Sequence, residues 1–134
     1  MSLVRDAMVP EPGALEGSAS AQEAGVRLSD PAVRAVFVVE DGKLLGVITR
    51  KTLVREIVAE GRDPRTTPVR EIAEPPRYTL DAGLDLEEAF KQLEQHDLER
   101  VPVVEDGRLV GIISRVVLQR RLAEDEPLAD ETEE

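Results

Sequence analysis

The chain has 134 residues, and its 17 Lys and Arg against 28 Asp and Glu give a formal net charge of −11 at pH 7. Such an acidic surface disfavours nucleic-acid polymers and anionic membranes, because basic residues drive non-specific binding to both. Cysteine is absent, which excludes disulfides, thiolate metal sites and cysteine nucleophiles. No apolar run approaches the ~20 residues of a membrane span. We expect a cytoplasmic protein.

An internal repeat organises the sequence. With an offset of 65 residues, Val4–Val58 aligns with Val69–Ala123 without a gap, and 19 of the 55 pairs are identical. Identity is densest where Val36–Arg50 aligns with Val101–Arg115. We therefore expect two motifs, a linker rich in turn residues, and an acidic tail without enough apolar surface to order itself. Their boundaries are residues 4–60, 61–68, 69–124 and 125–134 in that order.

The first motif reads as strand, helix, hairpin and closing helix. We expect a short strand at Ala14–Leu15, followed by a helix that begins with the capping box of residues 20–23. The hairpin is the clearest element, because two runs rich in β-branched residues flank Asp41-Gly42, the pair favoured by a two-residue type I′ turn. Thr49 is the expected N-cap of the closing helix.

The second motif repeats this order. A strand is expected at Tyr78–Leu80, a capped helix begins at Asp85, Asp106-Gly107 forms the hairpin turn, and Ser114 is the N-cap of the last helix. The runs Val36–Val39 and Leu44–Ile48 in the first motif are apolar on successive residues, so both faces of the sheet are expected to be buried.

These elements predict an α+β fold of the α/β type, because strands and helices alternate along each motif. Helices of one motif cover only one face of its sheet. We therefore expect the two small sheets to pack face to face with pseudo-two-fold symmetry. Clefts between the motifs would then suit small ligands.

The duplicated pattern resembles a tandem pair of CBS motifs, the regulatory module named after cystathionine β-synthase and also called a Bateman module. The resemblance is carried by Val38–Thr49, by Val101–Ser114, and by the openings Val4–Pro10 and Val69–Pro75. It implies two clefts that bind adenosine nucleotides such as AMP, ADP or ATP, or S-adenosylmethionine. It also implies a homodimer through the CBS motifs, with an unknown regulated protein as a further partner.

The ligand signature of the family is Gly-x-x-Thr/Ser-x-x-Asp after the third strand. The resemblance implies a role for each residue of this signature: the Asp carboxylate accepts hydrogen bonds from ribose hydroxyls, and the Thr or Ser hydroxyl lies near a phosphate. Here Thr49 and Ser114 retain the hydroxyl, whereas Thr52 and Val117 stand where the family has Asp. This departure puts nucleotide binding in question, most of all for the second motif.

Cations near these hydroxyls favour a phosphate. Arg50, Lys51 and Arg115 lie in the first turn of a helix, where a bound anion would offset their unfavourable interaction with the helix dipole. The alternative is that they extend into solvent or pair with nearby acidic groups. The candidate ligand-binding residues are Thr49, Arg50, Lys51, Thr52, Tyr78, Arg100, Val101, Pro102, Ser114 and Arg115.

Tyr78 and Arg100 each have an alternative interpretation. Arg100 precedes Val101-Pro102 and is placed at the mouth of a cleft, but a surface ion pair with Glu99 or Asp97 is the alternative. Tyr78 lies on the short first strand of its motif, and a half-buried core tyrosine is the alternative. His96 is the only histidine, and a lone histidine rarely makes a metal site.

No catalytic constellation accompanies these residues. The chain has no Gly-rich phosphate loop, nucleophile elbow or metal-ligand cluster, so we expect no enzyme activity. The acidic residues at the start of the second motif's first helix suit its dipole, with weak Mg²⁺ binding as the alternative. Two functions remain: a regulatory sensor of an adenosine-type molecule in an inter-motif cleft, signalling through dimer geometry, and a ligand-free scaffold for dimerisation or protein interaction.

Overall fold

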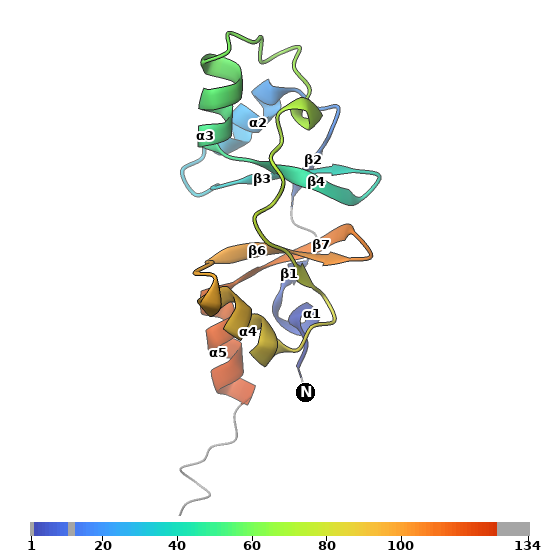
Figure 1. Cartoon of the computed structure of the whole chain (residues 1–134), viewed down its shortest axis with the longest axis vertical. Helices are drawn as coiled ribbons and strands as arrows, with labels where there is room; N and C mark the ends of the chain where they lie inside the picture. The colour runs from blue at the N-terminus through green and yellow to red at the C-terminus, as the bar shows by residue number, and fades with distance from the viewer. Residues whose placement is uncertain (1, 11–12, 126–134) are drawn as a thin grey trace, which may run out of the picture. The chain divides into compact units, whose positions relative to one another are not determined.

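The computed structural model describes residues 2–10 and 13–125 of the chain and has the predicted mixed α+β fold (Figure 1). Most of the predicted acidic tail lies outside the described residues. In chain order the elements are α1 (Val4–Ala7), β1 (Val9–Pro10), β2 (Ala14–Glu16), α2 (Ala21–Leu28), β3 (Val36–Glu40), β4 (Lys43–Ile48), α3 (Arg50–Leu53), a π-helical turn (Val54–Val58), a 3₁₀ turn (Val69–Glu71), β5 (Leu80–Asp81), α4 (Leu86–Gln95), β6 (Arg100–Glu105), β7 (Arg108–Ser114) and α5 (Arg115–Asp125).

Both predicted hairpins are present, and the geometry of their turns explains why both repeats have Asp-Gly at this position. Asp41 and Gly42 between β3 and β4 have φ angles of 53° and 82°, and Asp106 and Gly107 between β6 and β7 have 54° and 80°. A type I′ turn requires positive φ at both central residues, and Asp followed by Gly tolerates this at low cost.

The helix starts follow the predicted caps. The Ser20 hydroxyl accepts a hydrogen bond from the Glu23 amide at 3.2 Å, and the Asp85 carboxylate accepts from the amides of Glu87 and Glu88. The closing helix of the first motif is less regular than expected, because α3 continues into the π-helical turn. There the Ala59 amide donates to the carbonyl of Val54 at 2.8 Å.

The chain folds into two compact units that cut across the two repeats. One consists of residues 13–77 and 107–109 and is called the 13–77 unit here. The other contains the remaining described residues, namely 2–10, 78–106 and 110–125, and is called the 78–125 unit. Each unit therefore combines most of one repeat with the opening segment of the other.

Matching hydrogen bonds hold both opening segments. The Val4 amide donates to the carbonyl of Leu84 at 2.8 Å, and the Val69 amide donates to the carbonyl of Ala19 at 2.7 Å. These two bonds are equivalent under the offset of 65 residues. The opening segment of each repeat thus folds onto the body of the other repeat, and it does so in the same way twice.

The 13–77 unit is built on the three-stranded sheet β2-β3-β4. Strand β2 pairs parallel with β3, and β3 pairs antiparallel with β4. Helices α2 and α3 lie on the same face of this sheet (Figure 1). The core residues are Leu15, Ala21, Ala24, Leu28, Val36, Val38, Ile48, Ile57, Val69 and Ile72. Burial along β4 is less complete than the pattern predicted, because Leu45 is 42% exposed.

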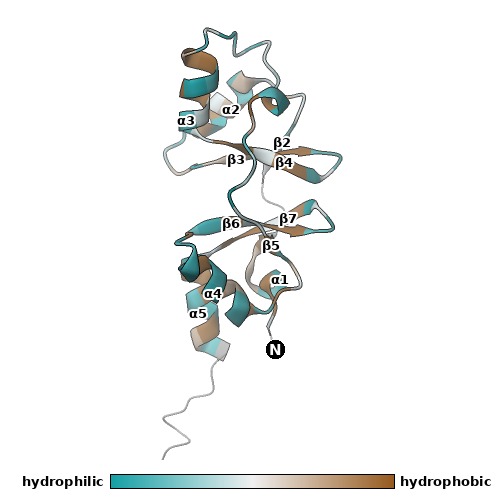
Figure 2. Ribbon diagram, in the orientation of Figure 1, coloured by the Kyte–Doolittle hydropathy of each residue, from teal (hydrophilic) through white to brown (hydrophobic). Residues whose placement is uncertain are grey.

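The 78–125 unit contains β1, β5, β6 and β7, with helices α1, α4 and α5 on one face of the sheet (Figure 1). Its core residues are Val4, Leu80, Ala82, Leu86, Ala89, Leu93, Leu98, Val101, Val103, Ile113 and Leu118. Helix α4 is coloured mostly hydrophilic in Figure 2, and its buried residues are Leu86, Ala89 and Leu93. In the described ranges, no helix combines the length and the apolar character needed to cross a membrane.

Candidate functional site

Thr49 and Thr52 form a reciprocal capping box at the start of α3. The Thr49 hydroxyl accepts a hydrogen bond from the Thr52 amide at 3.2 Å, and the Thr52 hydroxyl accepts one from the Thr49 amide at 3.0 Å. The two hydroxyl oxygens are 3.1 Å apart. Thr52 is fully buried, whereas Thr49 is half-buried. The predicted cap at Thr49 is therefore confirmed.

A carboxylate reaches this pair from a different part of the chain. The Thr52 hydroxyl donates to Oε2 of Glu74 at 2.5 Å, and Arg55 contacts the same oxygen at 2.7 Å. The backbone amide of Glu74 donates to the carbonyl of Val47 at 2.9 Å, and the Val47 amide donates in return at 2.8 Å. A carboxylate from the opening segment of the second repeat thus lies against Thr52, the residue that stands where the family motif has Asp.

Hydrogen bonding and charge favour the ionised form of Glu74 by lowering its pKa. The hydrogen bond from Thr52 holds the pKa of the Glu74 carboxyl below its ordinary value, and the nearby charges of Arg55 and Lys51 act in the same direction. Partial burial opposes this shift. Glu74 was not predicted from the sequence, because the family signature places the ligand-binding carboxylate in the first turn of the closing helix and not in the opening segment.

The two predicted cations beside Thr49 differ in their surroundings. Arg50 donates through its guanidinium to the carbonyl of Asp30 at 2.9 Å, which ties the start of α3 to the chain that follows α2. Lys51 is exposed and contributes positive charge near Glu74. Lys51 is therefore an exposed cation close to the Glu74 carboxylate.

In the 78–125 unit, Ser114 and Arg115 have structural partners. The Ser114 hydroxyl accepts from the amide of Val117 at 3.2 Å. Arg115 donates to the carboxylate of Glu99 at 2.5 Å and lies 3.5 Å from that of Asp97. Arg115 therefore pairs with nearby acidic groups, as the alternative interpretation stated. A shallow, open depression here is lined by Lys91, Glu94, Gln95 and Arg115.

The remaining four candidates also lie in the 78–125 unit. The Tyr78 hydroxyl donates to the side-chain oxygen of Gln92 at 2.6 Å, and its ring lies 4.9 Å from that of His96. Tyr78 packs partly buried against the core, as the alternative interpretation proposed. Val101 and Pro102 are buried in β6, whereas Arg100 is exposed at its first residue.

The structure thus gathers four of the ten candidates, Thr49, Arg50, Lys51 and Thr52, in the 13–77 unit. Glu74 and Arg55 join three of them, Thr49, Lys51 and Thr52, in what we call the Thr52–Glu74 cluster: Thr49, Lys51, Thr52, Arg55 and Glu74. Hydroxyls, a carboxylate and cations within one cluster can bind the hydroxyl and phosphate groups of one ligand. Within residues 2–10 and 13–125, no group of three or more His, Asp or Glu side chains is placed to hold a metal ion.

The family model and a similar relative both identify CBS domains. The CBS domain family model matches residues 4–59 and 69–124. The CBS domain-containing protein YhcV of Bacillus subtilis is 32% identical over 114 residues, which are 85% of this chain and 81% of the relative.

Solved structures show the same fold. A crystal structure of hypoxic response protein I with two coordinated zinc ions has a TM-score of 0.75 and 28% identity, over 90% of this chain and 99% of the other. A structure of CBSX2 in complex with AMP has a TM-score of 0.71 and 24% identity, over 92% and 98% of the two chains.

Proposed function

Because the chain belongs to the CBS-domain family, we propose that this regulatory CBS-pair module senses an adenosine-type small molecule. The family match covers both repeats, and the described chain contains little besides them. We therefore propose a regulatory role, and no catalytic one, for this chain.

The Thr52–Glu74 cluster is the observation that supports a ligand. A nucleotide presents hydroxyls that need an acceptor and a phosphate that needs donors and positive charge. Glu74 is a half-buried, ionised acceptor, while Thr49 and Lys51 offer a hydroxyl and an exposed ammonium group. Hydrogen bonds to ionised partners are stronger than those between neutral groups, so this set is suited to a charged, polyhydroxylated molecule.

A ligand signals only to the extent that it binds two arrangements of the protein with different affinity. We propose that the two arrangements are alternative geometries of a homodimer. Occupation of the site would then be transmitted to the regulated protein as a change in dimer geometry.

Thermal unfolding tests ligand binding directly. It is followed with an added dye, because the chain has no Trp and a single Tyr. AMP, ADP, ATP and S-adenosylmethionine are each added in separate experiments. A ligand at a concentration of about 100 times its dissociation constant raises the free energy of unfolding by roughly 2.7 kcal/mol. We expect a midpoint rise of several degrees with at least one of them. No shift with any of the four would contradict the proposal.

Substitution of Lys51 separates phosphate recognition from nucleoside recognition. We expect Lys51→Ala to weaken AMP binding several-fold and to leave adenosine binding unchanged. Lys43→Ala is the matched control, since Lys43 is another exposed lysine of the same unit, on β4. Equal losses for AMP and adenosine would show that Lys51 does not contact the phosphate.

A second candidate function, a ligand-free dimerisation scaffold, is favoured by exposed valines on the helices of the 13–77 unit. Val26, Val54 and Val58 are 67%, 59% and 72% exposed. The outer end of the α3 segment is accordingly coloured hydrophobic in Figure 2. The equivalent positions of the second repeat are the less apolar Lys91, Gln119 and Ala123. Exposed apolar residues that lie together often mark an interface.

Light scattering coupled to size exclusion tests the scaffold. We expect Val54→Asp/Val58→Asp to convert a dimer into a monomer, because charges at a self-associating apolar face are not paired. Val116→Asp, an equally exposed valine in the other unit, is the matched control and should remain dimeric. A dimer in all three proteins would place the interface elsewhere.

A further inference from the structure

The two repeats differ most where ligand chemistry is expected. Under the offset of 65 residues, the members of the Thr52–Glu74 cluster can be compared one by one with their counterparts. The equivalent pairs are Thr49 with Ser114, Lys51 with Val116, Thr52 with Val117, Arg55 with Arg120, and Glu74 with Val9. Three of these five pairs replace a polar or charged residue by valine. The replaced residues are the cation, the buried hydroxyl and the carboxylate.

Because the opening segments are exchanged, Glu74 and Val9 occupy equivalent places in the two units and not only equivalent positions in the sequence. Glu74 pairs through its backbone with Val47 of β4, and Val9 pairs with Ile112 of β7. Val47 and Ile112 are themselves equivalent positions of the two repeats. Each unit therefore receives one residue at the same place from the opening segment of the other repeat, and the residue is acidic in only one unit.

The carboxylate of Glu74 retains an open acceptor. Thr52 and Arg55 both contact Oε2, and Oε1 accepts no hydrogen bond from the part of the chain that the structure describes. The side chain of Glu74 as a whole is 41% exposed, so it is in contact with solvent. The Thr52–Glu74 bond fixes the carboxylate in place without using both of its oxygens.

The counterpart in the 78–125 unit keeps Ser114 and Arg120 but has valine at the other three positions. Val9 and Val116 are 59% and 57% exposed, and Val117 is half-buried. Three valines supply neither an acceptor for a hydroxyl nor a charge for a phosphate. Ser114 keeps its hydroxyl and caps α5 through the Val117 amide, as Thr49 caps α3 through the Thr52 amide. The difference between the two units therefore lies in the three valines.

We propose that the chain has one ligand site rather than two, that this site belongs to the 13–77 unit, and that Glu74 is its acceptor for the hydroxyls of a phosphorylated, polyhydroxylated ligand such as a nucleoside monophosphate. This inference rests on the proposed function and deepens it. It assigns the recognition of ligand hydroxyls to a residue of the second repeat that is delivered to the body of the first. Binding at one site would therefore involve both repeats.

Isothermal titration calorimetry with AMP tests the number of sites. We expect the wild-type chain to bind one AMP. We expect Thr52→Val/Glu74→Val to weaken binding at least tenfold. That variant reproduces the valine pair that the chain already carries at positions 9 and 117, so it removes both partners of the buried bond together. Glu71→Val, a nearby exposed carboxylate paired with Arg62, is the control and should bind as the wild type does.

A gain-of-site variant completes the test. Val9→Glu/Val117→Thr introduces the same pair into the 78–125 unit, and we expect the stoichiometry to rise toward two. Two AMP molecules bound by the wild type, or one bound with unchanged affinity after loss of Glu74, would overturn the inference while leaving the proposed function intact. Absence of AMP binding to the wild type, together with absence of binding to the other adenylates, would overturn the proposed function itself.

Discussion

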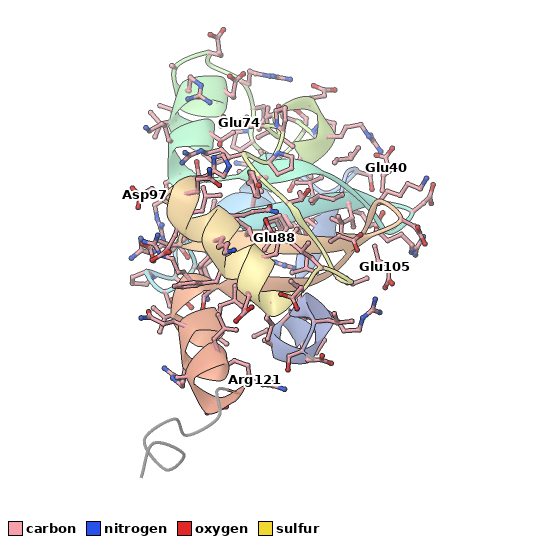
Figure 3. The ribbon with its side chains drawn as sticks, turned by 60° about the horizontal axis from the view of Figure 1, so that its bottom comes forward. Glu40, Glu74, Glu88, Asp97, Glu105 and Arg121 are labelled. Atoms are coloured by element: carbon pink, nitrogen blue, oxygen red, sulfur yellow. The ribbon has the colours of Figure 1, made fainter. Side chains whose placement is uncertain are left out.

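Arg70 donates from Nε to Oε1 of Glu40 at 2.9 Å, and this ion pair joins the opening segment of the second repeat to the hairpin of the first. Its counterpart under the repeat offset joins Arg5 to Glu105 at 3.2 Å. The two acceptors, Glu40 and Glu105, are labelled in Figure 3. The exchange of opening segments is thus repeated at the level of individual side chains. Conservation of both Val-Arg pairs between the repeats follows from this exchange.

Burial rather than charge should hold the exchanged segments. Val69 is fully buried, whereas the side chains of Arg70 and Glu40 are 46% and 44% exposed. We expect Val69→Ala to lower the free energy of unfolding by about 1.5–3 kcal/mol through lost burial and a residual cavity. Arg70→Ala should cost less than about 1 kcal/mol, because exposed ion pairs are screened by water.

Urea denaturation followed by circular dichroism measures both effects. Val26→Ala, a substitution of the same size at a site that is 67% exposed, is the control and should change little. A larger loss for Arg70→Ala than for Val69→Ala would show that the ion pair, and not the core, anchors the segment.

The Thr52–Glu74 pair should behave as one unit in a double-mutant cycle. Thr52→Val removes a capping acceptor and leaves Glu74 with Arg55, and Glu74→Val leaves a buried hydroxyl without its acceptor. Each single change should cost about 1–2 kcal/mol. The double change should cost less than the sum, by about 0.5–1.5 kcal/mol, because residues in contact are not independent. Additive losses would mean that the bond contributes nothing beyond its separate parts.

Acid should weaken the contribution of Glu74. Its folded-state pKa lies below the ordinary value of 4.5, so the unfolded chain binds more protons in that range. The stabilisation is therefore fully present above about pH 4.5 and is lost as the pH falls through the lowered folded-state pKa. We expect the stability difference between wild type and Glu74→Gln to stay constant above about pH 4.5 and to shrink as the pH falls below it. Its total should be less than about 1 kcal/mol, because the side chain is partly solvated.

Denaturation series at fixed ionic strength over this range test the pH dependence. Since glutamine does not titrate, the difference between the two proteins isolates residue 74. A difference that grows as the pH falls would have the wrong sign and would contradict the lowered pKa.

Arg115 should be a structural residue. Its side chain is only 22% exposed, it pairs with Glu99, and it donates weakly to the carbonyl of Leu93 near the end of α4. We expect Arg115→Ala to lower the free energy of unfolding by about 1–2 kcal/mol, since a hydrogen bond to a charged group is worth more than a neutral one. Arg50→Ala, at the equivalent but exposed position, should cost less. Similar losses at both positions would remove this distinction between the repeats.

Local signals predicted most of the fold. The Asp-Gly turns and the caps at Ser20, Thr49, Asp85 and Ser114 are properties of short stretches, and each is present in the structure. The π-helical turn after α3 was not predicted, because its hydrogen bonds leave no distinct pattern of apolar residues.

The exchange of opening segments could not be read from the sequence. Val4-Arg5 and Val69-Arg70 are identical dipeptides, so local preference is the same whether each packs on its own repeat or on the other. Glu74 was missed for the same reason, since its role depends on a contact with Thr52 across 22 positions of the chain. One signal was available: Thr52 and Glu74 are polar where both of their counterparts are valine.

The most direct test of the account is a titration of isotope-labelled protein with AMP, followed by amide chemical shifts. We predict that the largest changes cluster at Thr49, Lys51, Thr52 and Glu74, with smaller changes at the equivalent positions of the 78–125 unit, Ser114, Val116, Val117 and Val9. Changes centred on Ser114 and Val117 would contradict the assignment of the site to the 13–77 unit. A spectrum unaffected by AMP, ADP, ATP and S-adenosylmethionine alike would contradict the sensor and leave the scaffold as the function.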